Sequence, residues 1–241
     1  MKVKSIKTRI IAKGKTIESL LDDYLVSIND GSILAITSKV VSICEGNIRS
    51  DIRDKDELIR EEADQYLESD SPFVLTIKNN VLIPSAGIDE SNGDGNLILW
   101  PKDPFASARK IYDYLSKKFS LKNFGVIITD SKTSPLRWGT TGVAIAYAGF
   151  VALRDYRGEE DIFGRKLAVT QANYVDALAS SAVLVMGEGA EMTPMALIED
   201  LPFINFDSNS PTKKEIEDSK IKVDDDIYGP LLSSVPWKKG K

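Results

Sequence analysis

Apolar residues recur with the three- and four-residue spacing of an amphipathic helix in four stretches of the chain. These stretches cover residues 16–25, 55–69, 102–119 and 173–187, and the second has a strongly acidic outer face. Asp103 and Pro104 predict where the third helix begins, because Asp caps helix N-termini and Pro suits the first turn. Gly187 predicts the end of the fourth helix, as a C-cap.

Continuous apolar runs bounded by turn residues predict strands. The run at 31–43 reads as a buried strand that leads into a loop at "SICEGN", and 124–130 is the strongest core strand. Shorter strands are expected at 73–79, 80–84 and 96–101, while the Gly/Ala-rich segment 142–153 fits a strand or a helix. Strands and helices mix without a strict βαβ alternation, which favours an α+β fold of mixed sheets packed with helices.

The composition changes after Pro202, where the chain becomes polar. We therefore expect one body over residues 1–206, possibly of two subdomains. Residues 207–241 are expected to form a C-terminal extension that wraps over the body or a partner, with 207–226 extended.

The composition limits the kinds of catalytic and metal site that the chain can form. The chain has 241 residues, a net charge of -5, one cysteine and no histidine. It has no basic block for nucleic acid and no apolar stretch long enough for a signal peptide or a membrane span. A single cysteine excludes an intrachain disulfide and fits a reducing cytoplasm. Without histidine, Ser-His-Asp catalysis and His-ligated zinc are excluded, which leaves carboxylates, Lys, Arg, hydroxyls and an oxygen-ligated metal.

The stretch "SAGIDESNGDGN" at 85–96 gathers three carboxylates among glycines. EF-hand spacing fails, because counting from Asp89 puts Gly93 at position 5 and Trp100 at position 12. The "NGDG" part fits a hairpin bend, in which Gly93 and Gly95 allow positive φ. "GKT" at residue 14 and "GEGAEM" at residue 187 also fail the tests for a P-loop and a dinucleotide fingerprint.

Two strand ends carry candidate chemistry. Asp130 ends the core strand and could hold Mg²⁺, although an Asp that caps a turn is the simpler reading. Ser38 and Lys39 stand where another strand ends, and a lysine there could meet a phosphate or simply be solvated. The crowded charges at 154–165 fit a surface salt-bridge network of little stabilising value.

Taken in order, several segments resemble one family. They are "ITSKVVSICEGN", "AGIDESN", "LILWPKDPFASARKI", "VIITDS", "GVAIAYAGFVALRDYRGEEDIFGRKLAVT" and "LVMGEGAEMTP". Together they are similar to the coenzyme F420-0:L-glutamate ligases, also called F420 γ-glutamyl ligases, from the N-terminus to about Asp226. The resemblance implies an α+β fold that forms an intertwined homodimer around a nucleotide groove.

The resemblance also implies a reaction. Family members use GTP and a divalent metal, Mg²⁺ or Mn²⁺, to join L-glutamate to a small acidic cofactor precursor through an acyl phosphate. Carried over residue by residue, it implies an active-site loop, nucleotide-binding residues with Arg137 in the following loop, and metal ligands. These sets are Asp89, Glu90, Ser91 and Asn92 for the loop, Ser38, Lys39 and Arg137 for the nucleotide, and Asp130, Thr170 and Gln171 for the metal.

Some positions depart from the family pattern. Ile43 and Asn47 replace a lysine and an arginine, and Lys132, Thr133 and Ser134 replace a Phe-Gly-Arg. The sequence therefore predicts a GTP- or ATP-dependent glutamate ligase whose acceptor is F420-0 or a folate-like molecule. A non-catalytic nucleotide-binding homologue with a regulatory role is the alternative.

Overall fold

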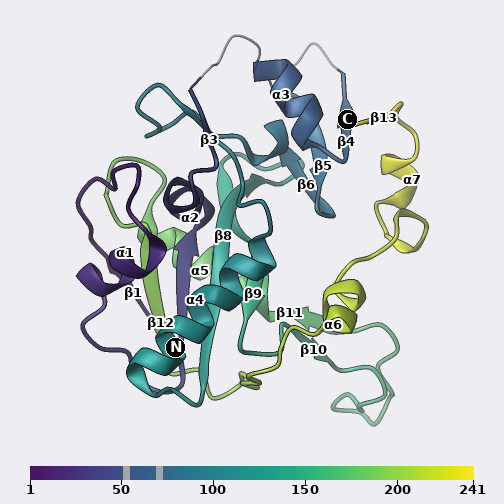
Figure 1. Ribbon diagram of the computed structural model, residues 1–241. Helices are drawn as coiled ribbons and strands as arrows, with labels where there is room; N and C mark the ends of the chain where they lie inside the picture. Colours follow the sequence, from purple (N-terminus) through teal and green to yellow (C-terminus); the bar gives the residue numbers. More distant parts are fainter. Residues whose placement is uncertain (51–54, 69–72) are drawn as a thin grey trace.

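A five-stranded sheet forms the centre of the molecule. The computed structural model describes residues 1–50, 55–68 and 73–241, and Figure 1 shows its elements. The strand order is β1-β12-β2-β8-β9, and the strands are Lys2–Ile6, Met195–Glu199, Ser32–Thr37, Phe124–Thr133 and Thr140–Ala148. β2 and β8 are parallel, whereas every other neighbouring pair in this sheet is antiparallel.

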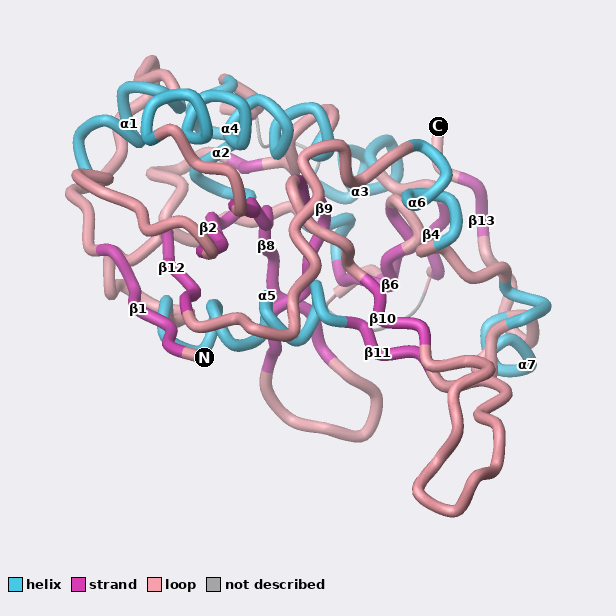
Figure 2. Tube along the Cα trace, turned by 90° about the horizontal axis from the view of Figure 1, so that it is seen from below, coloured by secondary structure: helices cyan, strands magenta, loops and turns pink. Residues whose placement is uncertain are grey.

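Helices cover both faces of this sheet, as the view in Figure 2 shows. One face packs against α1 (Ile17–Tyr24), α2 (Ser38–Glu45) and α4 (Pro104–Phe119), and the other packs against α5 (Tyr174–Met186). Successive strand residues point to opposite faces. In β2, Leu34 and Ile36 therefore join the first core, whereas Ile33 and Ala35 join the second. Burial on both faces explains why this strand is apolar without interruption.

The predicted helix ends are confirmed at α4 and α5. The Asp103 side chain accepts a hydrogen bond of 2.9 Å from the Ala106 amide, and Pro104 opens α4. Gly187 caps α5, with its amide bonded to the Val183 carbonyl. Both ends are set by local chemistry, which is why the sequence alone located them.

A smaller four-stranded sheet, in the order β13-β4-β5-β6, lies beside the main body. Its strands are Lys238–Lys239, Gln65–Leu67, Leu75–Lys78 and Val81–Pro84. Helix α3 (Lys55–Glu62) joins this unit. Its Ile59 packs with Ala86 and Ile88, which follow β6, and with Leu97 of β7 (Leu97–Ile98). β7 also pairs with β3 (Ile48–Arg49). Mixed sheets with packed helices confirm the α+β prediction.

The strand expected at 124–130 runs on to Thr133, and of the strand expected at 96–101 only Leu97–Ile98 forms. Two other predicted elements have larger boundary errors. The segment at 31–43 is a strand only to Thr37, and helix α2 begins at Ser38, with Val40 and Val41 packed into the core. The helix expected at 55–69 ends at Glu62, since the chain then pairs as β4 with β5 and β13; residue 69 lies outside the described residues. Both errors arise where packing with distant segments outweighs local periodicity.

The segment 142–153, open to either interpretation, forms most of strand β9 and reaches into β10 (Leu153–Asp155), which pairs with β11 (Gln171–Asn173). The segment at 207–226 is not simply extended. It contains α6 (Lys213–Asp218), started by a capping box between Thr212 and Glu215, and the short turn η2 (Val223–Asp225). The chain then forms α7 (Gly229–Leu232) on its way to β13.

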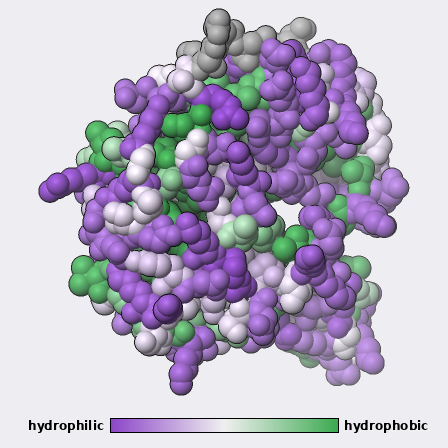
Figure 3. All heavy atoms as spheres, in the orientation of Figure 1, coloured by the Kyte–Doolittle hydropathy of each residue, from purple (hydrophilic) through white to green (hydrophobic). Residues whose placement is uncertain are grey.

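The C-terminal segment runs along one side of the molecule, from beside β10 and β11 to the small sheet (Figure 1). On the face shown in Figure 3, hydrophilic side chains dominate the region where α3 lies. None of the helices in the described ranges is long and apolar enough to cross a membrane.

Candidate active site

The parallel pairing of β2 with β8 ends at one edge of the main sheet, where β2 leads into α2. Asp130 does not end its strand as expected, because β8 continues to Thr133 by pairing with β9. Thr37 and Thr129 are register partners, so Ser38 and Asp130 follow side by side in the chain direction. Ser38 is buried at the first position of α2, and Lys39 lies in the same turn. Ligands of sheets with parallel strands bind beyond the carboxyl ends of those strands. This edge is therefore the natural place for a site.

The loop after β6 brings a second set of groups to the same edge. Asp89 and Ile98 exchange backbone hydrogen bonds of 3.0 and 2.9 Å, which closes residues 90–97 into a hairpin. Lys39 Nζ lies 2.7 Å from Asp89 Oδ2 and 2.9 Å from Ser91 Oγ. Three of the predicted residues are thus in direct contact, although 52 positions separate Lys39 from Ser91.

The predicted bend at "NGDG" is present. Asn96 holds it, because its side-chain amide donates to the carbonyls of Gly93 and Asp94, at 2.7 and 2.9 Å. Gly95 has the expected positive φ, but the other left-handed residues are Asn92 and Asp94. Gly93 is needed for a different reason: a Cβ there would lie 2.3 Å from the Asn96 carbonyl oxygen.

Asp130 is a half-buried carboxylate whose hydrogen-bond donors are neutral. It continues the row of Val126 and Ile128 on the face covered by α2 and α4. Oδ1 accepts a 2.8 Å hydrogen bond from the Ser131 amide, and Oδ2 accepts one from the indole nitrogen of Trp100. Burial raises the pKa of Asp130 to about 6, with the nearby Asp89 charge acting in the same direction.

Asp89 differs from Asp130 in its environment. Burial opposes its ionisation, but the bond and charge of Lys39, together with hydrogen bonds from Ser91, lower the pKa of this carboxyl. The Lys39 ammonium thus forms its ion pair with Asp89. Among the described residues, no cationic group is in hydrogen-bond contact with Asp130.

Glu90 and Asn92 tie the hairpin to its surroundings. Glu90 forms a 2.9 Å ion pair with Lys55 at the start of α3, and the Asn92 amide donates to the Gly189 carbonyl at 3.2 Å. The adjacent Glu188, for which the sequence predicted no role, accepts from Ser131 Oγ at 2.8 Å and from Thr140 Oγ1 at 3.1 Å. Its position after the α5 cap, in the family-like "MGEGAE" segment, is the feature that could have found it.

Comparison with known proteins shows which family the chain resembles. A family model described as F420-0:Gamma-glutamyl ligase matches residues 50–200. The chain is 33% identical over 238 residues to the coenzyme F420:L-glutamate ligase of Natronomonas pharaonis, covering 88% of this chain and 90% of the relative. Its identity to the ligase of the same name from Methanocaldococcus jannaschii is 34%, over 79% and 85% of the two chains. With the Methanopyrus kandleri ligase it is 36% identical, over 72% and 77%.

The chain belongs to the F420-0:γ-glutamyl ligase family. In this ligase, the half-buried Asp130 carboxylate has no cation in hydrogen-bond contact within the part of the chain that the structure describes. Such a group suits a divalent metal, which binds hard oxygen ligands and draws further ligands from substrate phosphates and water. Among the described residues, no three His, Cys, Asp or Glu side chains are grouped to hold a metal. Asp130 fits such an ion, and the charge of Asp89 acts on the Asp130 carboxyl.

Thr170 and Gln171 lie at the opposite end of the ligase fold. Helix α5 runs antiparallel to β9: Asp176 accepts from the Ala144 amide, Ser180 donates to the Gly142 carbonyl, and Glu188 contacts Thr140. Gln171 precedes the start of α5, whereas Glu188 follows its end beside Ser131. The 13 residues of α5 span about 20 Å. Within one chain, Gln171 and Asp130 therefore do not meet, and their shared metal site stays a prediction.

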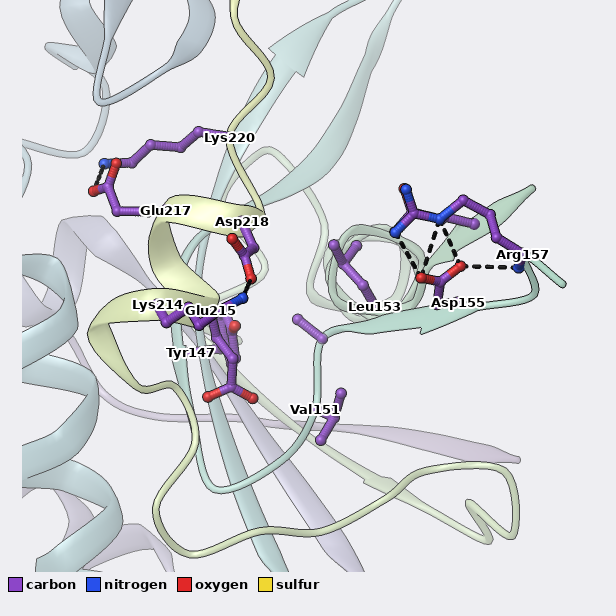
Figure 4. Close-up of a pocket in the computed structure, with 12 residues that line it drawn as sticks. Tyr147, Val151, Leu153, Asp155, Arg157, Lys214, Glu215, Glu217, Asp218 and Lys220 are labelled. Atoms are coloured by element: carbon purple, nitrogen blue, oxygen red, sulfur yellow. Dashed lines mark hydrogen bonds and ion pairs between the residues drawn. The ribbon is translucent and has the colours of Figure 1, made fainter. Parts of the chain in front are cut away.

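Gln171 instead lines a groove of about 630 Å³ between the β10–β11 hairpin and α6. Figure 4 shows three ion pairs among the charged groups of this groove: Asp155 with Arg157, Lys214 with Asp218, and Glu217 with Lys220. Glu215 instead accepts hydrogen bonds from Ser210 Oγ and the Thr212 amide. The Asp155–Arg157 pair and an Arg154–Glu159 pair bear out the predicted salt bridges of this segment.

Within the described parts of the chain, Arg137 makes no side-chain hydrogen bond or ion pair with Lys39, Asp89 or Asp130. It is exposed in the loop between β8 and β9, next to the fully exposed side chains of Leu136 and Trp138. Figure 2 shows this loop and the β10–β11 loop projecting from the body. The role of Arg137 in nucleotide binding stays a prediction.

Proposed function

We propose that this protein is a nucleotide- and metal-dependent ligase that adds L-glutamate to F420-0 through an acyl phosphate. The observation that carries the proposal is the contact of Lys39, Asp89 and Ser91 beside the half-buried Asp130, in a chain of this ligase family. Relatives of this chain are named coenzyme F420:L-glutamate ligases. GTP is the first choice of nucleotide and ATP the second.

The first step is a phosphoryl transfer. A carboxylate oxygen of the acceptor attacks the γ-phosphorus, the bond to the bridging oxygen breaks, and the nucleoside diphosphate leaves. A Mg²⁺ or Mn²⁺ ion held by Asp130 and substrate phosphates would offset the charge of the phosphates. Lys39, at the first turn of α2, supplies a point charge at the same edge, and Ser38 places a hydroxyl and an amide beside it.

The second step forms the amide. The glutamate amine attacks the carbonyl carbon of the acyl phosphate, the C–O bond breaks, inorganic phosphate leaves and the amine loses a proton. The 89–92 segment, anchored by Lys39, Lys55 and Gly189, would place Asp89, Glu90, Ser91 and Asn92 along one side of the two substrates. A fixed segment favours reaction because it orients the two substrates. No covalent protein nucleophile is required, which suits a chain without histidine.

A homodimer is part of the proposal. The two projecting loops carry apolar side chains with no cover in one chain: Leu136 and Trp138 are fully exposed, and Phe163 is 88% exposed. Apolar groups of this kind mark interaction sites. We propose that a second copy covers them and brings its Thr170 and Gln171 to the metal held by Asp130, with Arg137 reaching the nucleotide.

The test is a product assay. The protein is incubated with GTP or ATP, Mn²⁺ or Mg²⁺, L-glutamate and either F420-0 or a pterin acid, and products are read by mass spectrometry. We expect one added glutamyl unit on F420-0, with equal amounts of nucleoside diphosphate and phosphate. Asp130→Asn should lower the rate by about 100-fold or more, as the loss of a charge-stabilising group does. Asp113→Asn, on the exposed face of α4, is the matched control.

Each other outcome is decisive. Glutamylation of the pterin but not of F420-0 would replace the acceptor, in line with the departures at 132–134. A rise in melting temperature with nucleotide and metal, but no product on either acceptor, would favour the non-catalytic homologue. No binding of any nucleotide would refute the ligase.

A further inference from the structure

The indole of Trp100 donates its N–H to Asp130 Oδ2, across 30 positions of the sequence. The side chain is buried, with 1% of its surface exposed. A buried indole N–H needs an acceptor, and here the acceptor is the carboxylate proposed as metal ligand. An indole donor is neutral, so it can fix the direction of the carboxylate without cancelling its negative charge. A lysine at the same place would cancel it.

The turn that packs against this ring has an unusual backbone conformation. Ser85, Ala86 and Gly87 are three consecutive residues with positive φ, at 53°, 53° and 70°. Such conformations are costly for residues other than glycine and persist only when the surroundings hold them. The buried Thr76 hydroxyl does so, because it accepts from the Ala86 amide at 2.9 Å and donates to the Ile83 carbonyl.

The result of this left-handed turn is the close approach of Gly87 to the indole. A Cβ at Gly87 would lie 2.2 Å from Trp100 Nε1 and 2.5 Å from Cε2. Only glycine leaves space for the edge of the ring that carries the N–H. The turn, which opens the "AGIDESN" motif, thus packs against the Trp100 ring and also leads into the hairpin.

Two further contacts restrain the tryptophan. The nearly buried Lys78 ammonium lies 5.5 Å from the centre of its ring and forms a 2.8 Å ion pair with Glu62 of α3. Cations over an indole face are attracted by its quadrupole. The Trp100 carbonyl accepts a bond from the buried Asn47 amide. Ring and backbone are therefore held from different elements of the small unit and the main body.

We infer that Trp100 is a positioning residue for Asp130, which it sets in the orientation that binds the divalent metal. The inference rests on the proposed function. Each Asp130 oxygen accepts one bond from a neutral N–H, from Trp100 or from Ser131, which leaves another lone pair on each oxygen for the ion. Residues that orient a metal ligand in this way change metal affinity or activity by about 10- to 100-fold.

The test compares Trp100→Phe with the wild type. Phenylalanine keeps an aromatic ring but has no N–H. Free Mn²⁺ is measured by electron paramagnetic resonance during titration, with a non-hydrolysable GTP analogue present, and affinity for the analogue is measured separately in EDTA. We expect Mn²⁺ affinity to fall about 10- to 100-fold, with analogue affinity in EDTA unchanged. Trp237→Phe is the matched control, since it removes an indole bond to the Leu232 carbonyl in the tail.

A second variant guards against a folding defect. A benzothiophene analogue of tryptophan, incorporated at position 100 with Trp138 and Trp237 changed to phenylalanine, keeps the two-ring shape and lacks only the N–H. It is compared with the same double variant carrying tryptophan, and it should weaken Mn²⁺ binding as Trp100→Phe does. Unchanged Mn²⁺ affinity in this analogue would overturn the inference while leaving the proposed function intact. A wild type that bound no Mn²⁺ would overturn both.

Discussion

At the scale of single residues, the raised pKa of Asp130 means that ionising this carboxyl lowers the free energy of unfolding. Burial raises its pKa from 3.8 to about 6, so the folded chain retains this proton over a range in which the unfolded chain has lost it. Raising the pH from about 4 to 6 therefore lowers the free energy of unfolding. The contribution is at most about 3 kcal/mol, since each pKa unit corresponds to about 1.4 kcal/mol.

Asp130→Asn removes this titration. We expect its stability relative to the wild type to increase as pH rises from 4 to 6.5 and then to level off. Urea unfolding in EDTA, at a series of pH values, measures this difference in the absence of metal. Asp113→Asn should show no such trend. A constant difference between Asp130→Asn and wild type across this range would contradict the proposed burial of the charge.

At the scale of elements, the last strand attaches the C-terminal end of the chain to the small sheet. β13 pairs with β4, the Gly240 amide donates to the Asp64 carbonyl at 3.0 Å, and the Lys241 amide donates to Arg60 at 3.1 Å. The same unit carries Lys55, which holds Glu90, and Lys78, which contacts Trp100. The C-terminal extension therefore supports the small sheet that borders the candidate site.

Deletion of residues 236–241 should loosen this unit selectively. A three-stranded remnant loses its edge partner, and we expect faster amide exchange at 56–67 and 75–84, with β2 and β8 unchanged. Hydrogen-exchange mass spectrometry reads this directly. A double variant, Lys238→Ser with Lys241→Ser, is the control, because it removes only exposed ion pairs with Glu68, Glu57 and Glu61, which contribute little. Equal exchange in the deletion variant and the wild type would show that β13 stabilises nothing.

At the scale of the whole molecule, the distribution of predicted site residues is the main observation. Lys39, Asp89, Ser91 and Asp130 gather at one edge, whereas Gln171 lies beyond the far end of α5. If two copies complete each other's sites, variants defective at different edges should rescue one another. Such rescue would depend on the pairing of two copies, and not on a change in the folding of either chain or in its central sheet.

We expect the protein to have a mass about twice 26.5 kDa in solution, as measured by light scattering. Phe163→Glu should shift it toward the monomer and lower ligase activity. Val26→Glu, at a similarly exposed apolar position outside the projecting loops, should do neither.

Mixing Asp130→Asn with Gln171→Ala should restore part of the activity, since one intact site forms in a mixed dimer. Absence of rescue from a verified mixed dimer would reject the shared site.

The sequence by itself determined the features that depend on neighbouring residues. The periodicity of α1, α4 and α5, the Asp103 cap, the Gly187 end and the hairpin bend after Asp89 are all local. The lack of histidine limited the chemistry, and the ordered motifs indicated the family before any contact was known.

Only the tertiary structure decided the features that depend on distant partners. The start of α2 at Ser38 follows from packing. Strand β4 exists because it pairs with β5 on one side and with β13 on the other. Glu188 gained a role only once α5 delivered it to Ser131, and Trp100 only once the left-handed turn placed its ring on Asp130. Periodicity and propensity act over a few residues, whereas burial and hydrogen bonding join segments that the sequence keeps far apart.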